Sequence, residues 1–188
     1  MGHRFADLLF SPSVKAVQNE RDSRRIYQRW EGGADSHHRL EAREIQFLQQ
    51  RDSFYLASVN PDGWPYIQHR GGPKGFLKVL DAHHLGFADY TGNRQYITTG
   101  NLRENRRVAL FLMDYPNRRR LKLLGYAQEV APGSAALAEL CDPDYGATPE
   151  RGFIIQVAAF DWNCSQHIVP RYDQAALDSL IAQHKELP

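Results

Sequence analysis

The pattern of apolar and polar residues divides the chain into a helical beginning, a long middle rich in strands and a helical end. Apolar side chains at helical spacing predict one helix at 23–30 and a second at 40–50. The same spacing recurs at 175–185, close to the end of the chain. A short helix at 133–140 interrupts the strand-rich part. The helices therefore lie mostly at the two ends.

Between these helices, short segments rich in aromatic and β-branched residues predict β-strands. They cover 54–59, 64–70, 76–81, 85–90, 108–115, 121–130 and 153–162. Asn60-Pro61-Asp62-Gly63 joins the first two, with Pro at the second and Gly at the fourth turn position. Such local turns favour antiparallel pairing, and closure into a barrel removes exposed strand edges. The pattern predicts a mainly β (α+β) protein, a small antiparallel barrel of six or seven strands with peripheral helices.

The length of 188 residues indicates one domain with short arms. We place an N-terminal helical arm at 1–40, the barrel at 41–172 and a C-terminal helix at 173–188. Hydrophobic residues make up 42% and charged residues 24% of the chain, which excludes disordered and fibrous classes. A chain of this size buries enough surface to fold without disulfides or a structural metal.

Charge and cysteine content narrow the partners and the compartment. The formal net charge of +1 argues against a nucleic-acid partner, because binding to a phosphate backbone depends on many basic residues acting together. Two cysteines suit a reducing compartment. No apolar run is long enough to cross a bilayer, and the first residues lack the apolar segment of a signal peptide. We expect a cytoplasmic protein with no membrane partner.

Cys164 and His167 have a spacing that also occurs in metal sites. A structural zinc normally has four protein ligands, and no second pair accompanies these two, so we predict no metal site. A nucleophilic Cys164 would need a base in contact and a lowered thiol pKa, for which the sequence gives no sign. We therefore assign no catalytic residue.

The segment 88–102 carries the strongest indication of a ligand site. It follows an apolar strand and is dense in hydroxyl, amide and glycine groups. Such a loop offers N–H and hydroxyl donors to an anion, and a following helix start adds a favourable partial charge. Arg94 adds a guanidinium that can hold phosphate at two points. The alternative is a plain polar loop, because the same residue types are common in turns.

A second segment places a cation on a strand. Alternation puts Phe76, Lys78 and Leu80 on one face of 76–81. If that face points inward, the Lys78 ammonium needs an anionic partner such as a ligand phosphate, because an unpaired buried charge is costly. The alternative buries Leu77 and Val79 and leaves Lys78 in solvent.

Two later segments carry charge beside apolar residues. Leu121 and Leu123 share one strand face, while Arg120 and Lys122 share the other. The charged face is either a solvated edge or a cationic wall for an anionic ligand. The end of the last strand, from Phe160 to Tyr172, is rich in Trp, Asn, His and Arg, which fits the rim of a ligand site.

Taken in order, these segments resemble the pyridoxamine 5'-phosphate oxidase-like family of FMN-binding split barrels, and within it an uncharacterised flavin-binding branch. The likeness covers about residues 42–172. Its carriers are Gln68-His69-Arg70-Gly71-Gly72-Pro73, Phe76-Leu77-Lys78-Val79-Leu80-Asp81, Asp89-Tyr90-Thr91-Gly92-Asn93-Arg94-Gln95-Tyr96 running into Gly100-Asn101-Leu102, Val108-Ala109-Leu110-Phe111-Leu112-Met113-Asp114, and Trp162-Asn163-Cys164 with Pro170-Arg171-Tyr172.

The resemblance implies a six-stranded antiparallel split barrel that forms a homodimer, with FMN in each of two clefts between the subunits. The loop from Asn93 to Thr99 would hold the phosphate, and residues near Trp162 and Arg171 would come from the partner or rim the ring. The cofactor-binding residues that it implies are Arg70, Lys78, Tyr90, Asn93, Arg94, Gln95, Thr98, Thr99, Asn101, Arg120, Lys122, Trp162 and Arg171.

The implied function is an FMN-dependent oxidoreductase that acts on a small-molecule substrate or electron donor. The name-giving oxidases carry Ser-Arg-Lys in the phosphate loop and Arg-x-His near the C-terminus. Here Ile97-Thr98-Thr99 and Gln166-His167-Ile168-Val169-Pro170-Arg171 stand in those places, which argues against pyridoxamine phosphate as the substrate. Alternatives are a non-catalytic flavin carrier or sensor, a split barrel that binds haem or a deazaflavin, and a dimeric scaffold with an empty cleft.

Overall fold

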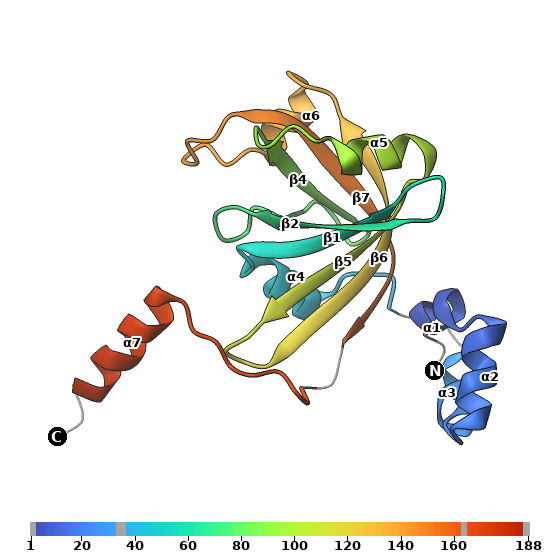
Figure 1. Cartoon of the computed structure of the whole chain (residues 1–188). Helices are drawn as coiled ribbons and strands as arrows, with labels where there is room; N and C mark the ends of the chain where they lie inside the picture. The colour runs from blue at the N-terminus through green and yellow to red at the C-terminus, as the bar shows by residue number, and fades with distance from the viewer. Residues whose placement is uncertain (1–2, 33–36, 163–164, 186–188) are drawn as a thin grey trace.

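The computed structural model describes residues 3–32, 37–162 and 165–185, which form one antiparallel sheet with helices at its periphery (Figure 1). The helices are α1 (Arg4–Leu9), α2 (Pro12–Glu20), α3 (Arg24–Tyr27), the 3-10 turn η1 (Gln28–Trp30), α4 (Ala42–Gln49), α5 (Ile97–Glu104), α6 (Ala135–Leu140) and α7 (Gln174–Lys185). The strands are β1 (Ser53–Val59), β2 (Pro65–Gly71), β3 (Lys78–Val79), β4 (His84–Tyr90), β5 (Arg107–Asp114), β6 (Arg119–Val130) and β7 (Pro149–Trp162).

The strands are ordered β2-β1-β5-β6-β7-β4-β3, and all of the paired strands run antiparallel. The long strands β6 and β7 span the sheet, and the sheet curls so that its inner face surrounds a common interior (Figure 1). The turn that joins β1 to β2 is closed as predicted, since the Gly63 amide donates to the Asn60 carbonyl at 3.0 Å. The predicted α+β class with an antiparallel sheet is confirmed.

The sheet has seven strands rather than the six that the family resemblance implied. The additional strand, β3, is only two residues long and pairs with β4 at the sheet edge, where Lys78 lies opposite Gly86. It is shorter than the predicted strand at 76–81 because Phe76 and Leu77 are buried in the core before the ladder begins. Each of the seven predicted segments overlaps one of the strands.

The core consists of the inward-facing residues of the strands, as alternation requires. Its aromatic centre contains Phe54, Phe76, Phe87 and Phe153, all buried. The Phe54 ring lies 5.5 Å from Phe76 and 5.2 Å from Phe87, and Phe87 lies 5.4 Å from Phe153. Offset and edge-on ring pairs of this kind add stability beyond the area that they bury. These rings also form a closely packed layer beneath the ends of β2, β4 and β7.

Helix α4 closes one end of this core. It begins at a capping box, in which the Glu41 amide donates to Glu44 Oε2 at 3.2 Å. Phe47 and Leu48 on its inner face are buried. The N-terminal helices α1 to α3 and the C-terminal helix α7 extend from the barrel on opposite sides (Figure 1). Within the described ranges, no helix is long and apolar enough to span a membrane. Cys164 lies outside the described residues.

Close contact between β6 and β7 depends on Gly125, which lies where the register of the two strands shifts. A Cβ atom at this position would lie 2.6 Å from Ile155 Cγ2 and 2.7 Å from the Gln156 carbonyl oxygen. The carbonyl belongs to the backbone of the neighbouring strand and has little freedom to move. A glycine is therefore required here.

We expect Gly125→Ala to destabilise the protein by about 1–3 kcal/mol, the usual effect of overpacking a well-filled interior. Gly100→Ala is the matched control, because Gly100 lies in α5 and nothing lies within 4 Å of its added Cβ. Replacing a helical glycine by alanine should stabilise by about 1 kcal/mol. Urea unfolding measures both changes, and equal effects of the two substitutions would contradict this account of the β6–β7 contact.

Candidate functional site

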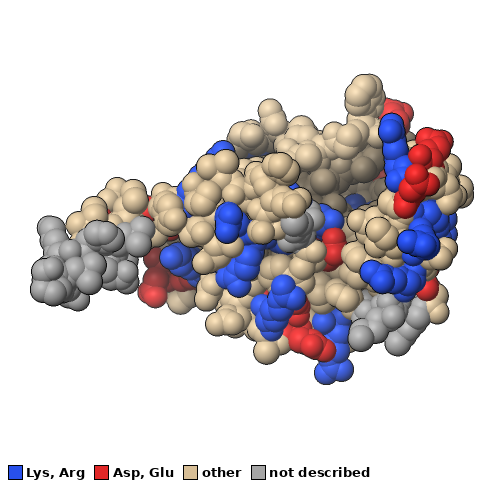
Figure 2. Space-filling view, turned by 90° about the horizontal axis from the view of Figure 1, so that it is seen from below, with Lys and Arg blue, Asp and Glu red and all other residues tan. Residues whose placement is uncertain are grey.

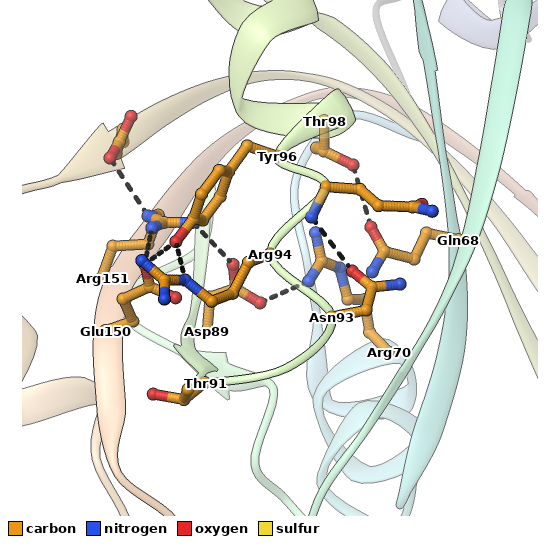
Figure 3. A network of polar contacts seen from close by, with 12 residues as sticks. Gln68, Arg70, Asp89, Thr91, Asn93, Arg94, Tyr96, Thr98, Glu150 and Arg151 are labelled. Carbon is orange, nitrogen blue, oxygen red and sulfur yellow. Dashed lines mark hydrogen bonds and ion pairs between the residues drawn. The ribbon is translucent and has the colours of Figure 1, made fainter.

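A cavity of about 160 Å³ lies between β2, β4, β7 and the loop that precedes α5 (Figure 3). It gathers seven of the predicted cofactor-binding residues, namely Arg70, Tyr90, Asn93, Arg94, Gln95, Thr98 and Thr99. The other residues that line it are Tyr66, Gln68, Asp89, Gly92, Tyr96, Ile97, Glu150 and Arg151. We call this the anion cavity, because its walls carry guanidinium, hydroxyl and amide donors.

Two arginines flank one carboxylate in the wall of the anion cavity. Arg70 Nη1, at the end of β2, donates a hydrogen bond to Asp89 Oδ1. Arg151 Nη1 lies 3.6 Å from the other oxygen of Asp89. The β4–β7 ladder pairs Asp89 directly with Arg151, so that strand register fixes this contact. The side chains are only 10% exposed for each arginine and 13% for Asp89.

Burial governs the ionisation of this group. It lowers the pKa of the Arg70 guanidinium, while the charge of Asp89 opposes that shift. It raises the pKa of the Asp89 carboxyl, against the opposing effects of Arg70 and Arg151. Arg70 Nε is buried and has no hydrogen-bond partner among the described residues. A buried donor left in this way is unusual.

The loop before α5 is held in a strained conformation. Arg94 and Tyr96 have φ angles of 59° and 54°, in the left-handed region that residues other than glycine seldom adopt. The Arg94 Nε donates to the Tyr96 hydroxyl at 3.1 Å, and that hydroxyl donates to Glu150 Oε1 at 2.7 Å. The Arg151 guanidinium lies 4.6 Å from the centre of the Tyr96 ring. Tyr96 thus joins the loop to β7.

The phosphate loop expected from Asn93 to Thr99 is shorter than predicted, because helix α5 begins at Ile97. Thr98 and Thr99 lie in its first turn, where backbone N–H groups have no partner within the helix. The Thr98 hydroxyl donates to Gln68 Oε1 at 3.2 Å. The sequence predicted a polar loop here because the helix buries only one apolar residue, Leu102. One such residue does not produce a helical pattern of apolar positions.

Asn101 lies outside the cavity lining, one turn further along α5. It is buried, and its Nδ2 donates to the Ser58 hydroxyl at 2.9 Å. The contact joins α5 to the inner face of β1. The structure therefore gives Asn101 a contact within the protein, which positions the helix that carries Thr98 and Thr99.

Three of the predicted cations lie on other parts of the barrel. Lys78 and Val79 are half-buried on β3, whereas both Phe76 and Leu77 before the strand are buried. Neither of the two alternating faces predicted for 76–81 is therefore buried along its whole length. Lys122 Nζ forms an ion pair with Asp161 Oδ2 at 2.7 Å. Arg120, on the same face of β6, has a buried Nε without a hydrogen-bond partner among the described residues.

Trp162 and Arg171 also lie apart from the anion cavity. The Trp162 indole N–H donates to Glu44 Oε1 of α4 at 2.6 Å. The Arg171 guanidinium lies 4.9 Å from the centre of the Tyr115 ring, in the wall of a second, wider cavity of about 720 Å³. That cavity lies between the ends of β1 and β5 and the segment that leads to α7.

Sequence reasoning missed Asp89, Tyr96, Glu150 and Arg151 as parts of the site. The available signal was a charged residue in a mostly apolar strand, which applies to Asp89 on β4. Figure 2 shows basic and acidic side chains interspersed over the face in view.

Residues 40–157 match the pyridoxamine 5'-phosphate oxidase family. The chain belongs to this family. The matched region includes every residue that lines the anion cavity. No curated protein matches the chain in sequence.

Solved structures show the same fold as this family member. The chain resembles HupZ of Group A Streptococcus at 17% identity, with a TM-score of 0.54 over 71% of this chain and 100% of that one. It resembles a candidate pyridoxamine 5'-phosphate oxidase of Lactobacillus delbrueckii at 22% identity, with a TM-score of 0.51 over 66% and 94% of the respective chains. These similarities support the split-barrel fold of the family.

We expect Asn101→Ala to destabilise the protein by about 1–3 kcal/mol, because it leaves the buried Ser58 hydroxyl without its donor. Replacing both residues in Ser58→Ala/Asn101→Ala should cost less than the sum of the two single changes. Urea unfolding of the four proteins gives the coupling energy. Strictly additive effects would show that the two side chains do not interact.

Proposed function

We propose that this protein binds FMN with the phosphate in the anion cavity and works as a flavin-dependent oxidoreductase. The observation that carries the proposal is the set of buried donors around one cavity, above all Arg70 with its unpartnered Nε. Charge-assisted hydrogen bonds from guanidinium groups to phosphate are short, strong and directional. Membership of the pyridoxamine 5'-phosphate oxidase family supports the same cofactor.

The size of the anion cavity fits only one end of the cofactor. Sites that enclose a whole ligand usually measure about 300–1,000 Å³. At about 160 Å³ the cavity has room for a phosphate, so the flavin ring would lie beyond its mouth. Arg70, Arg94 and the first turn of α5, with Thr98, would hold the phosphate.

A homodimer would supply the remainder of the site. The outer faces of β2, β1 and β6 carry apolar side chains in solvent, with Ile67, Tyr55 and Tyr126 65%, 42% and 38% exposed. The ladder places Tyr55 beside Phe111 and Ala57 beside Ile67, so that the exposed residues of β1 and β2 form one surface that continues onto β5. Apolar surface of this extent favours contact with another protein. A second copy covering it would bring its own residues, such as Arg171, toward the flavin.

When bound, FMN supplies the transfer of electrons or hydride, and the protein supplies binding and orientation. The buried arginines would fix the phosphate, and the rigid aromatic core beneath them would fix the arginines. The Arg70 guanidinium lies 5.8 Å from the Phe87 ring and 5.9 Å from the Phe153 ring.

We expect the purified protein to show the two absorption bands of oxidised flavin. Arg70→Ala and Arg94→Ala should each weaken FMN binding about 10- to 100-fold, which corresponds to the loss of one charge-assisted contact. Arg103→Ala is the matched control, because Arg103 lies on α5 outside the anion cavity. Fluorescence quenching of FMN measures the three dissociation constants.

The result that would reject the cofactor is a colourless protein that ignores added FMN, or one that shows a haem Soret band or a single deazaflavin band. Equal affinities of the two cavity variants and the control would reject the site. Steady-state consumption of NADH or NADPH with oxygen or a dye tests turnover. Flavin binding without turnover with any reductant would favour the carrier or sensor.

A further inference from the structure

The anion cavity contains its own negative charges. Its cations are Arg70, Arg94 and Arg151. Each of them lies close to an acid, since Asp89 contacts Arg70 and Arg151, and Glu150 contacts Arg151 and the tyrosine that Arg94 donates to. Glu129 from β6, which lies outside the cavity lining, is 3.3 Å from Arg151 Nε. The lining itself carries three arginines and two acids, and Glu129 offsets the remaining positive charge before any ligand enters.

Asp89 is the carboxylate most closely tied to the arginine that the ligand needs. Its Oδ1 accepts a hydrogen bond from Nη1 of Arg70, which lies on β2. The charged and titratable groups that surround it are Arg70 on β2, Glu150 and Arg151 on β7, Glu129 on β6 and, through Glu150, Arg94 and Tyr96 of the loop (Figure 3). An entering phosphate would meet the Asp89 carboxylate on the same guanidinium.

We propose that FMN binding is coupled to the uptake of one proton by Asp89, whose carboxylate occupies Arg70 in the free protein and gives way to the phosphate. This inference depends on the proposed function and adds to it a control of cofactor binding by pH. The proton comes from the solvent and remains on an Asp89 oxygen while FMN is bound. No covalent bond forms or breaks elsewhere.

Burial selects Asp89 over the other two acids for this proton. The side chain of Asp89 is 13% exposed, compared with 27% for Glu150 and 36% for Glu129. Like charges repel more strongly where less water screens them, so that a phosphate acts most on the least exposed carboxylate. Burial already raises the pKa of Asp89, whereas the hydrogen bond from Tyr96 lowers the pKa of Glu150.

The coupling reverses the pH dependence that a simple cationic site would have. The second pKa of a phosphate monoester is about 6, so that a site holding only cations gains affinity as pH rises through 6 and is then constant. If the complex carries one more proton than the free partners, raising the pH opposes binding. FMN affinity should then fall by up to about tenfold for each pH unit.

Calorimetric titration of the protein with FMN at pH 7.5 in HEPES and in Tris tests the proposal, because the difference in heat between the buffers counts the protons taken up. We expect about one proton for the native protein. Asp89→Asn should take up none, bind FMN more tightly at pH 8 and show no fall in affinity from pH 7 to 8.5. Glu139→Gln, on α6, controls for the loss of one negative charge.

Tight FMN binding by the native protein without proton uptake would overturn the inference while leaving the proposed function intact. So would a folded Asp89→Asn protein with the pH profile of the native one. The native measurement stands even if the variant fails to fold, which circular dichroism would show. Failure of the native protein to bind FMN at any pH would overturn the proposed function itself.

Discussion

A guanidinium removed from water must have a negative partner, and in this protein that requirement organises the whole candidate site. Arg70 lies over the buried rings of Phe87 and Phe153, where few water molecules can reach it. Asp89 provides the partner, and Arg151 balances the second oxygen of that carboxylate. The group is stable as it stands, yet it retains a buried Nε with no acceptor among the described residues. In the proposed complex, the phosphate competes with Asp89 for this guanidinium.

The strand pairing of the sheet fixes the positions of these charged side chains precisely enough to favour one kind of ligand over another. Asp89 and Arg151 lie opposite one another in the β4–β7 ladder, so that the backbone sets their separation rather than flexible side chains. A register shift after Asp89 turns the chain into the strained loop that leads to α5. Tyr96 fastens that loop to β7, and Asn101 fastens the helix to β1. Strain of this kind persists where the surrounding contacts are strong, and it is concentrated at functional sites.

The pattern of apolar residues located the segments in which the strands lie, although it left their number at six or seven. Five of the strands contain buried residues, whereas β2 and β3 contain only half-buried and exposed ones. The pattern of apolar residues did not predict helix α5, because the inner face of that helix is mostly polar. Its polar side chains form hydrogen bonds with Gln68 and Ser58. About half of the residues that the family resemblance implied for cofactor binding line one cavity. The sequence did not predict the ion pair between Lys122 and Asp161 or the hydrogen bond between Trp162 and Glu44, because these contacts join segments that are far apart in the chain. The carboxylates of the cavity were not predicted, because only cations and N–H or hydroxyl donors were considered as partners of an anion.

The central claim is that the phosphate, rather than the ring, provides most of the attraction of this protein for its cofactor. Parallel fluorescence titrations with FMN and with riboflavin, which lacks the phosphate, test it most directly. The account predicts that riboflavin binds at least about 100-fold more weakly, as expected for the loss of more than one charge-assisted hydrogen bond. Equal affinity for the two flavins would contradict it.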